Sequence, residues 1–140
     1  METLNARVEA LKVKAREILR MEWICELLED ISNLTISNDN NQKQITEYEK
    51  ELARAEYKLS ILDTNDPEFE IKTKASTEWV NTCKERLAER MEATAKNTER
   101  NTLTIEKLND TIAKIESGEK KVSIDRVYEL TRKMISNLAK

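Results

Sequence analysis

The sequence predicts an all-α fold: a long antiparallel helical hairpin with coiled-coil packing, and a short third helix that packs at its root to form a three-helix bundle at that end. Of the 140 residues 36% are charged, well above the usual quarter or so of globular domains. One Gly and one Pro are too few for the many tight turns of a sheet-rich fold. Apolar residues recur at alternating steps of three and four, as in a coiled-coil seam. We expect residues 1–140 to form a single helical domain.

The first helix is expected at about residues 3–62. Its seam is clearest in the second half, at Ile45, Tyr48, Leu52, Ala55, Leu59 and Leu62. The same steps continue backward through the Asn-rich stretch 36–41, which leaves two alternatives. The poor helix propensity of Asn and Asp favours a break there. The preserved register favours a continuous helix with Asn in its seam, because a loop has no reason to keep the phase.

Residues 18–31 are more apolar than one narrow seam requires. A second heptad phase precedes them, at Leu4, Val8, Leu11, Ala15 and Ile18. A wide apolar stripe indicates more than one neighbouring helix. We therefore expect the third helix to cover residues 4–28.

Residues 63–67 are the strongest turn signal in the chain. Pro67 suits the first position of a helix, with Asp66 or Thr64 as its N-cap. A second helix of about residues 67–116 should follow, with its seam again at steps of three and four.

Gly118 suits the left-handed residue that ends a helix, which predicts a turn at 117–122. Ser123 is then the expected N-cap of a third helix over 123–138.

If the two long helices fold back at the turn, Asn38 lies beside Thr94 and Asn41 beside Met91. The hairpin thus acquires a polar layer, made of Asn38, Asn41, Thr94, Thr98 and Asn101. This layer either sets the register of the two helices or forms a weak hinge. Cys25 and Cys83 are expected to be buried thiols, too far apart for a disulfide.

Composition argues against catalysis. The chain has no His, which removes the commonest general base and metal ligand, and one Gly cannot build a phosphate-binding loop. Acidic groups such as Glu26, Glu29 and Asp30 are expected to be solvated helix faces. We expect no enzyme activity, no cofactor and no bound metal. The net charge of −3 and the absence of a signal peptide or membrane-length apolar run predict a cytoplasmic protein.

Two sets of residues are candidates for partner binding. The aromatic set is Trp79, Trp23, Tyr57 and Tyr128. Trp79, beside the seam, either lies along the groove or anchors another chain, whereas Trp23 is expected in the core and Tyr57 on the surface. The basic set is Arg126, Arg132 and Lys133 in the last helix.

The functional expectation is a non-enzymatic coiled-coil interaction protein that binds a protein partner or forms a homodimer through its helical faces. An adaptor, an assembly factor or a small inhibitor would have such a sequence. The abundance of Asn, Lys, Ile, Thr and Glu is typical of AT-rich genomes, which favours a phage accessory protein in the host cytoplasm. The alternative is a nucleic-acid-associated accessory factor that uses the basic last helix.

Overall fold

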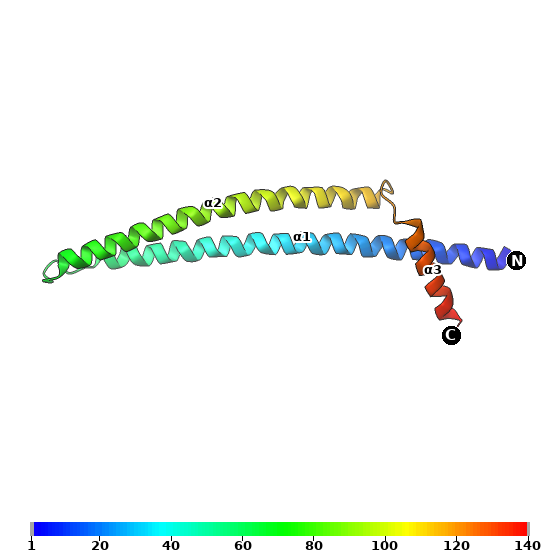
Figure 1. Cartoon of the computed structure of the whole chain (residues 1–140), viewed down its shortest axis with the longest axis horizontal. Coiled ribbons are helices and arrows are strands. Elements are labelled where there is room, and N and C mark those ends of the chain that lie inside the picture. The colour runs from blue at the N-terminus through cyan, green and yellow to red at the C-terminus, as the bar shows by residue number, and fades with distance from the viewer. Residues whose placement is uncertain (1, 140) are drawn as a thin grey trace. The chain divides into compact units, whose positions relative to one another are not determined.

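A computed structural model describes residues 2–139, with side chains from residue 4 onward. Within these residues the secondary structure is entirely α-helical: α1 spans Glu2–Ser60, α2 spans Phe69–Glu116 and α3 spans Ile124–Leu138 (Figure 1). The expected all-α fold is confirmed, with α1 and α2 packed together and α3 at the root. The chain divides into two compact units, each described by itself below. We call Met1–Asn33 with Thr104–Lys140 the root unit, and Leu34–Leu103 the hairpin unit.

α1 continues without interruption through residues 36–41. Asn38 and Asn41 lie half-buried against α2, and both side chains accept hydrogen bonds from it. These bonds satisfy polar groups that would otherwise favour a loop, so tertiary contacts outweigh the low helix propensity of Asn.

The apolar core of the hairpin unit lies near the turn. Ala55, Val80 and Cys83 are buried there, with Leu52 and Leu59 packed against them. All five residues belong to the two seams that the heptad pattern identifies, and Cys83 fills a small core position as an aliphatic residue would. The seam positions of α1 and α2 therefore face each other.

The register of the two helices differs from the prediction. Asn38 bonds to Asn101, which lies two helical turns beyond Thr94, the expected neighbour. The connection between α1 and α2 is residues 61–68, longer than the expected 63–67. In Figure 1 it extends past the last turn of α1. At Asn38 the neighbour on α2 is therefore a later residue than expected, whereas Asn41 contacts Arg90, which adjoins the expected Met91.

The start of α2 is capped by Asp66. Its Oδ1 accepts the backbone N–H of Glu68 at 2.8 Å, and its Oδ2 accepts Lys72 Nζ at 2.6 Å. The hydrogen bond from Lys72 and then the bond from Glu68 lower the pKa of this carboxyl. Of the two predicted caps, the structure selects Asp66.

The root unit contains two apolar clusters on different sides of α1. α3 contributes Val127 to the first, beside Ala15 and Leu19 of α1, and in Figure 1 it crosses that part of α1 obliquely. α2 contributes Ile112 and Ile115 to the second. The side chains that complete the clusters are Val122, Leu130 and Met134 in the first, and Trp23, Ile24, Leu27 and Ile31 in the second.

Two local expectations for this region change. Trp23 packs with the α2 residues, so α3 does not account for the wide apolar stripe there. Ser123 precedes α3, but its side chain makes no capping hydrogen bond, and only its carbonyl accepts from Val127. Gly118 has the expected left-handed conformation, with φ +82°.

Candidate interaction surfaces

A row of apolar side chains on α1 in the root unit is left uncovered by both α2 and α3. Ile18, Met21 and Leu28 are 37%, 49% and 50% exposed, and Cys25 between them is also exposed. Their spacing of three, four and three residues is that of a coiled-coil seam. We call these four residues the outer stripe.

Acidic side chains border the outer stripe. A shallow depression of about 490 Å³ is lined by Ile18, Met21 and Cys25 together with Glu17, Glu22 and Glu26. The buried clusters occupy other sides of α1, since Ala15 and Leu19 contact α3 and Ile24 contacts α2. The outer stripe is therefore a third apolar face of the same helix.

A second apolar surface lies nearer the N-terminus, where α3 runs beside α1. We call it the N-terminal groove. It encloses about 580 Å³, and its lining residues are Leu4, Arg7, Val8, Ala10, Leu11, Lys14, Ile135 and Leu138. Its floor is apolar, and the two charged residues in its lining are basic.

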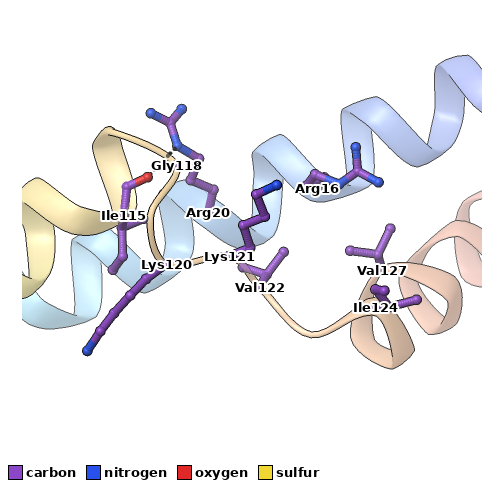
Figure 2. Close-up of a pocket in the computed structure, with 9 residues that line it drawn as sticks. All are labelled: Arg16, Arg20, Ile115, Gly118, Lys120, Lys121, Val122, Ile124 and Val127. Atoms are coloured by element: carbon purple, nitrogen blue, oxygen red, sulfur yellow. Dashed lines mark hydrogen bonds between the residues drawn. The ribbon is translucent and has the colours of Figure 1, made fainter.

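Basic residues gather around the connection between α2 and α3. A cavity of about 540 Å³ has an apolar floor that includes Ile115 and Val127, and its basic lining residues are Arg16, Arg20, Lys120 and Lys121 (Figure 2). The charged ends of Arg16, Arg20 and Lys121 point to one side in Figure 2, whereas Lys120 points the other way. The four positive charges therefore do not converge on one point.

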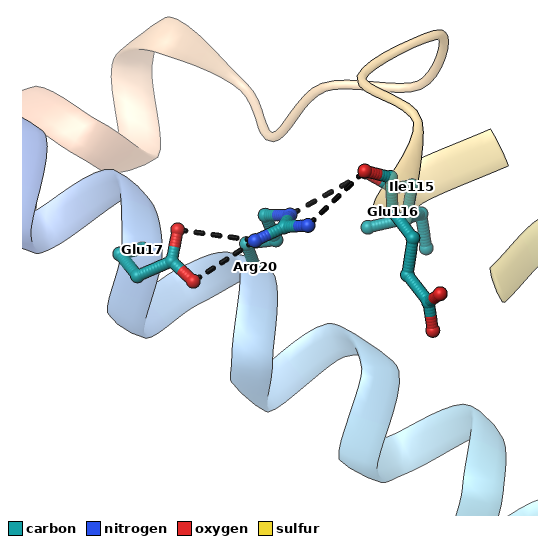
Figure 3. A network of polar contacts seen from close by, with 4 residues as sticks. All are labelled: Glu17, Arg20, Ile115 and Glu116. Atoms are coloured by element: carbon teal, nitrogen blue, oxygen red, sulfur yellow. Dashed lines mark hydrogen bonds and ion pairs between the residues drawn. The ribbon is translucent and has the colours of Figure 1, made fainter. Parts of the chain in front are cut away.

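Arg20 is engaged by the fold itself. Its Nη2 donates to the Glu116 carbonyl at 3.2 Å and its Nε donates to the Ile115 carbonyl at 3.4 Å, while Glu17 holds its Nη1 at 2.9 Å (Figure 3). The last carbonyls of a helix lack intrahelical partners and carry partial negative charge. Arg20 thus caps the C-terminus of α2 from α1, an interaction that the heptad analysis did not predict.

The predicted aromatic residues are divided between the two units. Trp79 is 42% exposed in the hairpin unit, where the guanidinium of Arg86 lies 5.3 Å from its ring centroid. Tyr57 is exposed, as expected, and Trp23 lies half-buried against the α1–α2 cluster. Tyr128, in the root unit, is 46% exposed with Lys12 Nζ at 5.2 Å from its ring. Their roles in partner binding stay predictions.

The basic residues of α3 lie among carboxylates. Arg126 and Lys133 line a depression that also contains Glu22 and Glu129. Lys133 Nζ lies 3.7 Å from Glu129 Oε1, and Arg132 is exposed. This neighbourhood reduces the positive field that a nucleic acid would meet.

The polar layer of the hairpin unit contains a direct amide pair. Asn101 Nδ2 donates to Asn38 Oδ1 at 2.8 Å. Beside it, Arg90 Nη2 approaches Asn41 Oδ1 at 3.5 Å, and Thr94 is 6% exposed. A half-buried amide pair between two helices is satisfied in only one alignment of the helices, so this geometry fits the register-setting interpretation.

Both cysteines are free thiols. Cys83 is buried, and desolvation, with a smaller contribution from Glu51, raises the pKa of its thiol. The expectation that Cys25 is buried is wrong, because Cys25 lies on the outer stripe.

Among residues 4–139, whose side chains the structure describes, no three Cys, Asp or Glu side chains lie close enough together to hold a metal ion. In that part of the chain, no helix is long and apolar enough to cross a membrane.

Comparison of the chain with protein-family models, with curated proteins and with solved structures gives no match.

Proposed function

We propose that this chain is a non-enzymatic interaction protein that binds another protein through exposed helical faces. The observation that supports the proposal is the outer stripe, a heptad-spaced apolar row that neither α2 nor α3 covers. Isolated exposed apolar residues are ordinary, but an aligned row is what an amphipathic partner helix packs against.

The N-terminal groove supports the same proposal. Leu4 and Leu138 are 63% and 76% exposed, and they border a concave apolar surface. A partner helix that filled this groove would bury apolar area that the chain by itself leaves in water, and such burial is the main favourable term in association.

The test is capture from a native lysate with the immobilised chain, using Met21→Asp as the disabling variant. The matched control is Ile71→Asp, because Ile71 is also an exposed apolar helix residue, 72% exposed, but lies outside both surfaces. We expect the wild type and the control to retain a saturable partner that Met21→Asp loses. A wild-type chain that stays monomeric and captures nothing would contradict the proposal.

The second candidate function is nucleic-acid binding. It rests on the positive ends of Arg16 and Lys121, which share one side of the cavity between α1 and the α2–α3 connection. The test is a mobility shift with DNA and RNA at low salt. Binding that weakens steeply with salt and is lost in Arg16→Glu/Lys121→Glu would support it. No shift at low salt would exclude it.

A further inference from the structure

The same helix carries both exposed surfaces, and their charges are opposite. Residues 4–16 contain four basic residues and one acidic residue, a net charge of +3. Residues 17–30 contain five acidic residues and one basic residue, a net charge of −4. α1 therefore changes sign within the root unit.

The sign change follows the apolar surfaces. Arg7 and Lys14 line the N-terminal groove, whereas Glu22 and Glu26 line the depression at the outer stripe. Within the described residues, the structure gives none of these four side chains an ion-pair partner.

The two surfaces also share one face of α1. At about 100° per residue, Leu4, Arg7, Leu11 and Lys14 fall in the same angular sector as Ile18, Met21 and Cys25. This face has a basic apolar half followed by an acidic apolar half. Such a face is complementary to a second copy of itself placed in the opposite direction.

We propose that two copies of this chain form an antiparallel, two-fold symmetric dimer in which the outer stripe of each copy packs in the N-terminal groove of the other. The inference rests on the proposed function and names the partner as a second copy. With the two-fold axis near residue 16, Leu4 faces Leu28 and Leu11 faces Met21. Arg7 then lies beside the carboxylates of Glu22 and Glu26 of the second copy. The pairing is isologous, so the same charge match occurs twice.

The size of this face sets the expected affinity. Residues 4–28 span ~37 Å of helix, and a width of ~12 Å gives roughly 450 Å² per copy, or about 900 Å² in total. Interfaces below about 1,200 Å² belong to weak and transient complexes. We therefore expect a dissociation constant of about 1–100 μM, measured by sedimentation at protein concentrations up to roughly 200 μM.

Charge reversal tests the pairing directly. Arg7→Glu/Lys14→Glu changes the net charge of residues 4–16 from +3 to −1 and places two carboxylates opposite Glu22 and Glu26 of the second copy. Glu22→Lys/Glu26→Lys changes the net charge of residues 17–30 from −4 to 0 and places two ammonium groups opposite Arg7 and Lys14 of the second copy. Each variant alone should associate at least about tenfold more weakly than wild type, because like charges then meet at both junctions. An equimolar mixture of the two variants should recover a species of twice the 16.3 kDa chain mass, because opposite charges again meet at both junctions.

The mixture guards against misfolding, since a variant that fails to fold cannot be rescued by the other. Lys43→Glu/Lys84→Glu is the matched control; it makes the same charge change at two exposed residues of the hairpin unit and should dimerise as wild type does.

A wild-type chain that is monomeric at the highest concentration overturns the pairing. The pairing is also overturned if either charge-reversed variant dimerises alone, or if the mixture of the two variants does not dimerise. If the wild type is monomeric but captures a protein that the Met21→Asp variant does not, only the dimer is wrong. If the capture also yields nothing, the proposed function fails with it.

Discussion

Replacing Arg20 with alanine should loosen the last turn of α2. The wild-type guanidinium donates to the carbonyls of Ile115 and Glu116, at 3.4 and 3.2 Å. A buried hydrogen bond from a charged donor contributes roughly 1.5–3 kcal/mol. The Arg20 side chain is 34% exposed and one of the two bonds is long, so we take about 1 kcal/mol for the pair. A cation at a helix C-terminus adds about 0.5 kcal/mol.

The sum of about 1.5 kcal/mol corresponds to a roughly tenfold larger equilibrium constant for local opening. The readout is amide hydrogen exchange at the end of α2, where Ser117 N–H donates to the Ala113 carbonyl at 2.9 Å and Lys120 N–H to the Lys114 carbonyl at 3.0 Å. Local exchange suits this variant, because it reports the opening of the last turn of α2 rather than the unfolding of the whole chain.

Two variants make the measurement specific. Arg16→Ala removes the same charge from the neighbouring turn of α1, where the structure shows no hydrogen bond from Arg16 to α2, so exchange at Ser117 and Lys120 should change little. Arg20→Lys keeps the charge but loses the forked donor geometry, so its effect should be intermediate. Equal exchange rates in Arg20→Ala and Arg16→Ala would refute the capping role.

Four further predictions concern the polar layer, the two thiols and the α2–α3 connection. Asn101→Ala leaves the Asn38 amide without its partner and should lower the free energy of unfolding by about 1 kcal/mol in urea titrations. Asn38→Leu/Asn101→Leu leaves no unpaired amide, so its free energy of unfolding should exceed that of Asn101→Ala. If Asn101→Ala is as stable as wild type, the hydrogen bond between the two amides is not formed. A thiol reagent should modify exposed Cys25 at once and buried Cys83 only on opening; equal rates would contradict the burial. Burial raises the pKa of the Cys83 thiol above its ordinary 9.0, so the folded chain favours the neutral thiol. The stability that this preference contributes is fully present below pH 9.0 and is lost as the pH rises through the raised pKa. Cys83→Ala should remove this alkaline loss of stability in denaturant titrations. In Gly118→Ala the added Cβ meets no atom within 4 Å, but the backbone φ of +82° is unfavourable for alanine. The variant should therefore be about 1–2 kcal/mol less stable than wild type in denaturant titrations. An unchanged midpoint would contradict the left-handed conformation.

The local elements were predictable because their signals are local. Heptad spacing, Pro67 with Asp66, and Gly118 each act within a few residues, and they mark the helices and both connections close to where the structure has them. The continuity of α1 through its Asn-rich stretch was left open because propensity and register disagree there. Packing against α2 decides it, through the bond between Asn38 and Asn101.

The candidate surfaces were harder to predict. The sequence showed that residues 18–31 are too apolar for one seam, and the expected explanation was that the third helix covers them. The structure has α3 against Ala15 and Leu19 instead, which leaves the outer stripe exposed. Helical-wheel angles separate the three apolar faces of α1, but they carry no information about which face receives a neighbour.

The all-α class, the three helices and their seams are predictable from the sequence, because they depend on periodicity and on capping and turn residues that act over short distances. Tertiary packing determines the register of α2 on α1, the Arg20 cap on α2, and which face of α1 stays uncovered. These features depend on the length and path of the connections at 61–68 and 117–123. Side chains far apart in the chain meet only after those connections have set where the helices lie, and no short-range pattern encodes that placement.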